Sequence, residues 1–95
     1  MLKKFKGLKY TEKIITKMCS IVGANPKDID FKKKGWYLDY SWTEKEQNNF
    51  IKWLSDYLYN NSGARKEIMA LPLKNRVNTK GVAMMFVLNY GFKLK

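Results

Sequence analysis

The residues best suited to chemistry in this 95-residue chain are its lysines, which gather in short clusters. Nineteen Lys and Arg face eight Asp and Glu, so the formal net charge is +11, and there is no histidine. Such an excess of positive charge points to a polyanionic or acidic partner. The lack of histidine removes the commonest general base near neutral pH and the commonest metal ligand. We therefore expect a non-enzymatic binding protein with no catalytic residues, metal or cofactor.

The basic clusters suggest how a nucleic acid would be held. Lysine acts as a point charge on phosphate, whereas readout of base edges in DNA depends on the arginine fork, and this chain has far more Lys than Arg. DNA or RNA would thus be bound through its backbone, with little sequence preference. One tyrosine among the lysines is a candidate for stacking on bases. The residues predicted to contact nucleic acid are Lys32, Lys33, Lys34, Tyr37, Lys74, Arg76 and Lys80.

A second set of candidates is an aromatic ladder over residues 36–42. Trp36, Leu38, Tyr40 and Trp42 alternate with more polar residues, which is typical of a strand with one buried face. The alternation favours packing of this ladder against helices, and exposure of the ladder as a surface that stacks unpaired bases is the alternative. Tyr37 lies on the opposite face of the predicted strand and is the better candidate for exposure.

Acidic residues near the lysines raise one enzymatic alternative. Asp30-Phe31-Lys32 has the acid-x-lysine form of one class of metal-dependent nucleases, and Asp28 and Asp39 could add carboxylates for Mg²⁺. The wide gap that usually separates the first acid from the acid-x-lysine pair is absent. Charge pairs across a hairpin explain these residues more simply.

The first half of the chain must position these groups with a helix and a β-hairpin. An apolar stripe predicts a helix that Thr11 caps and Gly23 ends. Alternation over residues 28–42, with a turn at residues 33–35 and Gly35 in a left-handed conformation, predicts the hairpin. The tail 92–95 alternates too and is a candidate third strand.

The second half reads as three helices. Thr43 and Glu46 form a capping box before a long amphipathic helix that ends at residues 60–63. A short helix over residues 64–71 follows. Asn78 is expected to cap a last helix over residues 79–90, apolar almost all round, with Gly91 as a left-handed stop. A strand through residues 82–88 is the competing prediction. The expected fold class is α+β: helix, β-hairpin, long amphipathic helix, short helix, C-terminal helix.

Length and composition set the remaining expectations. The chain is expected to form a single domain over residues 1–95, in which residues 1–9 are either a flexible basic arm or an edge element. The lone Cys19 sits at an apolar helical position and is expected in the core. The longest apolar run, residues 82–88, is far below the roughly 20 residues needed to span a bilayer. We expect a soluble, cytoplasmic protein that makes no membrane contact.

Two stretches resemble a known group of proteins. The run Trp42-Thr43-Glu44-Lys45-Glu46 continuing through Phe50, Trp53 and Leu54, and the ending Phe86-Val87-Leu88-Asn89-Tyr90-Gly91-Phe92-Lys93, are similar to small uncharacterised proteins encoded by tailed bacteriophages. The resemblance implies a context rather than an activity: small basic phage proteins commonly bind nucleic acid or disable a host enzyme or defence system.

Two function classes follow from these observations. The first is non-enzymatic binding of nucleic acid through Lys–phosphate contacts. The second is a phage-encoded inhibitor, similar in action to an anti-CRISPR protein, that binds an acidic-surfaced host or defence protein. In that case charge would steer the encounter, while Trp36, Tyr37 or Tyr59 would anchor the complex if exposed. A pocket for small phosphorylated molecules and a structural role in the virion are further alternatives, and the oligomeric state stays open.

Overall fold

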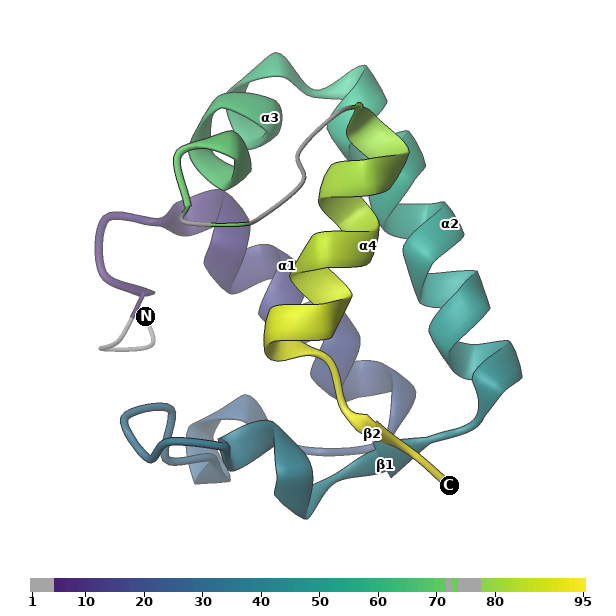
Figure 1. Cartoon of the computed structure of the whole chain (residues 1–95). Helices are drawn as coiled ribbons and strands as arrows, with labels where there is room; N and C mark the ends of the chain where they lie inside the picture. Colours follow the sequence, from purple (N-terminus) through teal and green to yellow (C-terminus); the bar gives the residue numbers. More distant parts are fainter. Residues whose placement is uncertain (1–4, 72, 74–77) are drawn as a thin grey trace.

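The fold is seen in a computed structural model, which describes residues 5–71, 73 and 78–95. Four helices lie above a small layer of short 3₁₀ turns and a two-stranded parallel sheet (Figure 1). The whole is a small α+β fold, as the sequence predicts at this coarse level. The elements are α1 (Lys9–Ile21), η2 (Pro26–Asp28), η3 (Trp36–Asp39), β1 (Ser41–Trp42), α2 (Glu44–Asn60), α3 (Ser62–Met69), α4 (Thr79–Tyr90) and β2 (Lys93–Leu94).

The long helix α2 is the element that the sequence marks most clearly. The Thr43 hydroxyl accepts from the backbone N–H of Glu46 at 3.1 Å, and the Glu46 carboxylate accepts from the backbone N–H of Thr43 at 2.9 Å. These two bonds confirm the predicted capping box. Phe50, Leu54 and Leu58 are buried along one face of the helix. At its other end, Arg65 donates to the carbonyl oxygens of Leu58 (3.0 Å) and Tyr59.

Helices α3 and α4 also begin at side-chain caps. Asn61 Oδ1 accepts from Ala64 N at 3.2 Å, and Asn78 Oδ1 accepts from Gly81 N at 2.8 Å, as predicted for Asn78. Residues 82–88 are helical, so the competing strand prediction is wrong. Gly91 is not the left-handed stop that we predicted, because its φ is −76°. Glycine is needed there for space, since a Cβ atom would collide with the Val87 carbonyl oxygen.

Helix α1 begins differently from the prediction. Its N-cap is Leu8, which offers no side-chain acceptor, and Thr11 lies inside the helix and is buried. The acceptor comes from α3: Glu67 Oε2 accepts from Thr11 N at 2.5 Å and from Thr11 Oγ1 at 2.9 Å. A carboxylate 56 residues away thus caps the first turn of α1.

The predicted β-hairpin over residues 28–42 is wrong. Asp30 Oδ1 accepts from Lys32 N at 3.1 Å, and this local turn bends the chain where the hairpin needed an extended strand. Gly35, left-handed at φ 78° as predicted, then leads into the 3₁₀ turn η3 rather than a second strand. In η3 the side chains repeat about every three residues, so Trp36 is buried while Leu38 is 54% exposed.

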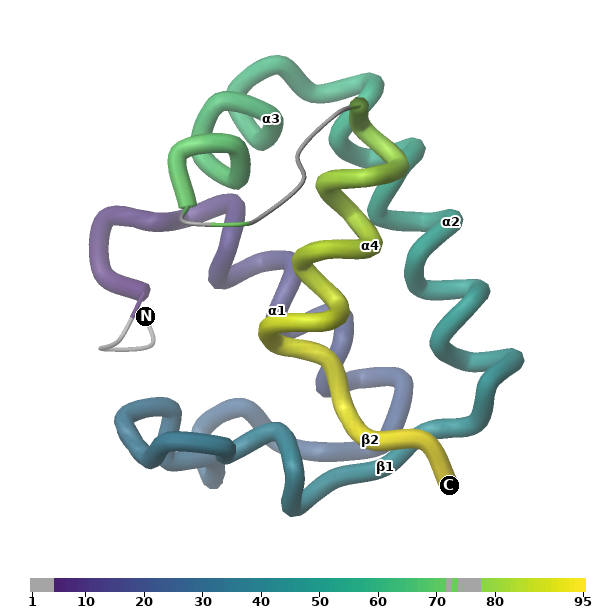
Figure 2. The backbone as a smooth tube through the Cα atoms, viewed as in Figure 1, coloured from purple at the N-terminus to yellow at the C-terminus, as the bar shows by residue number. Residues whose placement is uncertain are grey.

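A small parallel sheet replaces the hairpin. Ser41 and Trp42 of β1 pair with Lys93 and Leu94 of β2, so the C-terminal tail does join this segment, as one of only two strands in the sheet. Figures 1 and 2 show the two strands side by side below the end of α4. The pairing brings the ring of Phe92 to 5.3 Å from Trp42 and 6.0 Å from Trp36.

The buried apolar side chains form one cluster that all four helices share. Cys19 is fully buried in it, as predicted, and burial raises the pKa of its thiol to about 11. Phe5 is also buried, with its ring 5.2 Å from Phe31. Residues 1–4 of the predicted basic arm lie outside the described residues.

Candidate nucleic-acid interface

Lys32, Lys33 and Lys34 lie in the segment that connects η2 to η3, and we call these three residues the lysine loop. All three side chains are exposed, because buried aromatic residues on either side hold the loop at the surface. Phe31 and Trp36 pack edge to face at 4.7 Å beneath it. Lys33 Nζ lies 3.3 Å from the Asp39 carboxylate, and both side chains are more than half exposed. An exposed pair of this kind contributes about 0–1 kcal/mol, so Lys33 remains available to a ligand.

The aromatic ladder divides between core and surface. Trp36 and Trp42 are buried, which agrees with packing, whereas Tyr40 is half-buried and Leu38 exposed. Tyr37, the predicted stacking residue, is half-buried and meets Trp36 edge to face at 5.8 Å. The contact with Trp36 therefore covers part of the Tyr37 ring, and only the rest of the ring is accessible to a base.

The three acidic residues near the loop line one shallow hollow of about 190 Å³. Asp28, Asp30 and Asp39 all border it, together with Lys33. Across the described ranges, however, no group of three or more His, Cys, Asp or Glu side chains is arranged to hold a metal ion. Asp30 accepts a hydrogen bond from the backbone N–H of Lys32, and Asp39 forms an ion pair with Lys33, so both contacts are local.

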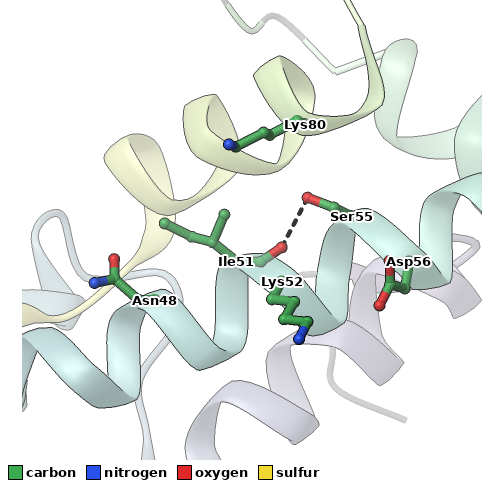
Figure 3. Close-up of a pocket in the computed structure, with 6 residues that line it drawn as sticks. All are labelled: Asn48, Ile51, Lys52, Ser55, Asp56 and Lys80. Carbon is green, nitrogen blue, oxygen red and sulfur yellow. Dashed lines mark hydrogen bonds between the residues drawn. The ribbon is translucent and has the colours of Figure 1, made fainter.

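Lys80 lies on the first turn of α4, beside a groove between α2 and α4. Figure 3 shows Lys80 across this groove from Ile51 and Ser55, whose hydroxyl donates to the Ile51 carbonyl at 2.8 Å. The groove has a volume of about 430 Å³. Its lining residues are Asn48, Ile51, Lys52, Ser55, Asp56 and Lys80.

The predicted contact residues do not form one continuous site in the described part of the chain. The lysine loop lies at the end of the molecule that carries the sheet, whereas α4 begins at the opposite end (Figure 1). Lys74 and Arg76 lie outside the described residues. The Phe5–Phe31 contact does bring the exposed Lys6 toward the lysine loop, an addition that no local sequence pattern indicates.

The acidic residues do little to neutralise the basic ones. Four of the nineteen Lys and Arg residues are outside the described residues, which leaves fifteen, and among these Lys33 alone has a carboxylate within 4 Å. Glu46 and Glu67 are instead used to cap helices, and Asp30 to form a turn. The positive charge is therefore left at the surface.

Sequence reasoning missed an aromatic surface on α2. Trp53 stacks on Tyr57 with ring centroids 5.1 Å apart and an interplanar angle of 11°, and Lys17 Nζ of α1 lies 5.6 Å from the Trp53 ring. Trp53 and Tyr57 are only half-buried. Both lie on the apolar face of the long amphipathic helix that the sequence predicts, where helical spacing alone does not separate core residues from surface ones. The signal that could have revealed them is the width of that apolar face, which exceeds what the core covers.

Comparisons with known proteins add no further guide: no protein-family model, curated protein or solved structure matches this chain. Within the described residues, no helix is both long and apolar enough to cross a membrane.

Proposed function

We propose that this protein is a non-enzymatic, cytoplasmic nucleic-acid-binding protein that contacts phosphates through lysines with little sequence preference. The observation that carries the proposal is the uncompensated charge: fourteen of the fifteen described Lys and Arg residues have no carboxylate within 4 Å. Unpaired surface lysines attract phosphates at long range and release counterions on contact.

The lysine loop supports the proposal because it is rigidly supported at its base. Phe5, Phe31 and Trp36 form a chain of edge-to-face contacts beneath it, so its backbone is held while its side chains remain in water. Ordering a preformed loop costs less entropy on binding than ordering a flexible tail. Lys80 would provide a second, separate contact.

The test is fluorescence anisotropy of labelled duplex DNA, single-stranded DNA and RNA at several salt concentrations. Binding should weaken steeply with salt, with a log–log slope of about −0.9 for each duplex phosphate contacted. The triple variant K32Q/K33Q/K34Q should reduce that slope by about two to three. A flat salt dependence of the unmodified protein would refute the proposal.

A matched control removes the same charge elsewhere. The variant K9Q/K45Q/K66Q neutralises three exposed lysines on α1, α2 and α3, and should reduce the slope by less than about one. If both triple variants lost affinity equally, net charge rather than the lysine loop would account for binding.

A second candidate is the phage-encoded inhibitor of a host or defence protein. The observation favouring it is a set of exposed apolar side chains, since Tyr59 is 72%, Leu88 70% and Met84 44% exposed. Trp36 is buried and cannot serve as the anchor we predicted, which leaves Tyr59 and the half-buried Tyr37. For a partner captured from host lysate, Tyr59→Ala should then raise the off-rate, while single lysine changes should mainly lower the on-rate. Loss of the partner through lysine changes alone would exclude the anchor.

A further inference from the structure

Three aromatic residues form a continuous stack along α2. Phe50 and Trp53 have ring centroids 5.7 Å apart at an interplanar angle of 29°, and Trp53 and Tyr57 follow at 5.1 Å and 11°. The stack begins in the core, where Phe50 is buried, and continues outward to the half-buried Trp53 and Tyr57. It therefore presents ordered aromatic surface at the edge of the core.

Two hollows meet at Trp53, and we call them together the Trp53 groove. The first, about 220 Å³, lies between α1 and α2 and is lined by Lys17, Ile21, Glu46, Asn49, Phe50 and Trp53. The second, about 300 Å³, follows the C-terminal half of α2 and is lined by Trp53, Asp56, Tyr57, Asn60 and Asn61. Aromatic rings with a few amide groups are suited to a planar, polar-edged ligand such as a nucleobase.

The charges around the groove favour a phosphate backbone along α1. Lys17 lies over the Trp53 ring at 5.6 Å, and Lys13 precedes it by four positions on the same helix face. Both lysine side chains are exposed. Two carboxylates of α2 line the groove: Glu46, which is occupied by its capping box, and Asp56. Phosphates are therefore expected to follow α1 rather than α2.

We propose that the Trp53 groove binds an unpaired base of single-stranded nucleic acid. Tyr57, the outer ring of the stack, would stack on the base, Trp53 would support the Tyr57 ring from behind, and Lys17 would contact phosphate. This inference rests on the proposed function and adds that the protein prefers single-stranded nucleic acid to a duplex. A duplex hides its base faces and can use only the lysines, whereas a single strand can use both the lysines and the groove.

The experiment compares Tyr57→Leu with Tyr59→Leu, using labelled oligo(dT) of about 15 nucleotides and duplex DNA of the same length. Tyr59 is the matched control because it is a tyrosine on the same helix, is exposed, and lines neither hollow. Tyr57→Leu should weaken oligo(dT) binding by about 5- to 100-fold and leave duplex binding unchanged within about twofold. Tyr59→Leu should leave both unchanged.

The outcomes separate the two proposals. If duplex and oligo(dT) bind with a steep salt slope but Tyr57→Leu behaves like Tyr59→Leu, the groove is overturned while lysine-based binding stands. If the unmodified protein binds neither probe at low salt, both proposals fail.

A second measurement needs no variant and so does not depend on the folding of Tyr57→Leu. Oligo(dT) carrying 5-iodouracil is photo-crosslinked to the unmodified protein, and the modified peptides are mapped. Crosslinks at Trp53 or Tyr57 support the groove, and crosslinks confined to other aromatic residues such as Tyr37 overturn it.

Discussion

The carboxylate of Glu67 should be among the most important polar groups for stability, because it lies on α3 yet caps the first turn of α1. It accepts from both Thr11 N (2.5 Å) and Thr11 Oγ1 (2.9 Å), and Thr11 is only 1% exposed. Glu67→Ala would leave a buried N–H and a buried hydroxyl without their acceptor. The loss of a hydrogen bond to a charged group costs about 1.5–3 kcal/mol. Because Glu67 itself is half-buried and water can partly replace it, we expect a total loss of about 2–4 kcal/mol.

Two further variants divide this loss between charge and geometry. Glu67→Gln keeps an oxygen acceptor but removes the charge at the positive end of α1, and should cost about 1 kcal/mol. Thr11→Val removes only the hydroxyl and should also cost about 1 kcal/mol. In the Glu67→Ala background, Thr11→Val should cost almost nothing, because the hydroxyl has already lost its acceptor. The coupling free energy between the two sites should therefore be about 1 kcal/mol.

The assay is urea unfolding followed by far-ultraviolet circular dichroism, which reports the free energy of unfolding. Glu44→Ala is the control, since Glu44 is exposed and makes no hydrogen bond among the described residues; it should change stability by only a few tenths of a kcal/mol. The reasoning is refuted if Glu67→Ala costs less than about 0.5 kcal/mol, or if the Thr11 and Glu67 substitutions are additive.

Three other predictions test the fold. Burial raises the pKa of Cys19 from 9.0 to about 11, so the unfolded chain ionises first as pH rises; the stabilisation is complete below pH 9.0 and is lost by about pH 11. The stability advantage of the unmodified protein over Cys19→Ala, measured by urea unfolding, should accordingly shrink between about pH 9 and about pH 11, and a constant difference would contradict this. Thr43→Ala should cost about 1 kcal/mol in the same assay. Hydrogen bonds from the Thr43 backbone and side chain lower the pKa of Glu46, so this variant should move that pKa part of the way back up in an NMR titration; an unchanged value would argue against the capping box. Gly91→Ala should destabilise by about 1–3 kcal/mol through collision with the Val87 carbonyl, and an unchanged melting temperature would show that the end of α4 can shift freely.

Helices were predictable from this sequence because their signals are local. The Thr43–Glu46 box and the Asn78 cap each lie within four residues of the groups they bind, and the apolar stripes repeat at helical spacing. The prediction of a hairpin was wrong because alternation of apolar and polar residues over a short segment does not distinguish a strand from a series of tight turns. There the Asp30 turn and packing against Phe5 and Phe92 decide the conformation.

The candidate sites were less predictable, since they depend on contacts between distant segments. The exposure of Lys32, Lys33 and Lys34 follows from their charge and was expected. The Trp53 groove was not, because whether an aromatic residue on a helix is covered depends on how closely a neighbouring helix approaches. Similarly, nothing near Thr11 in the sequence indicates that Glu67 would bind it.

The pairing of β2 with β1 also sets an order of events during synthesis. Phe92 completes the aromatic contacts of Trp36 and Trp42, yet it is added to the chain about fifty residues after Trp42. At usual elongation rates of 5–20 residues per second, those two tryptophans wait for roughly 3–10 s without it. During that interval the nascent chain exposes an apolar surface that chaperones or other nascent chains can bind. Slow stretches of translation between residues 42 and 92 would therefore be expected to lower the yield of folded protein.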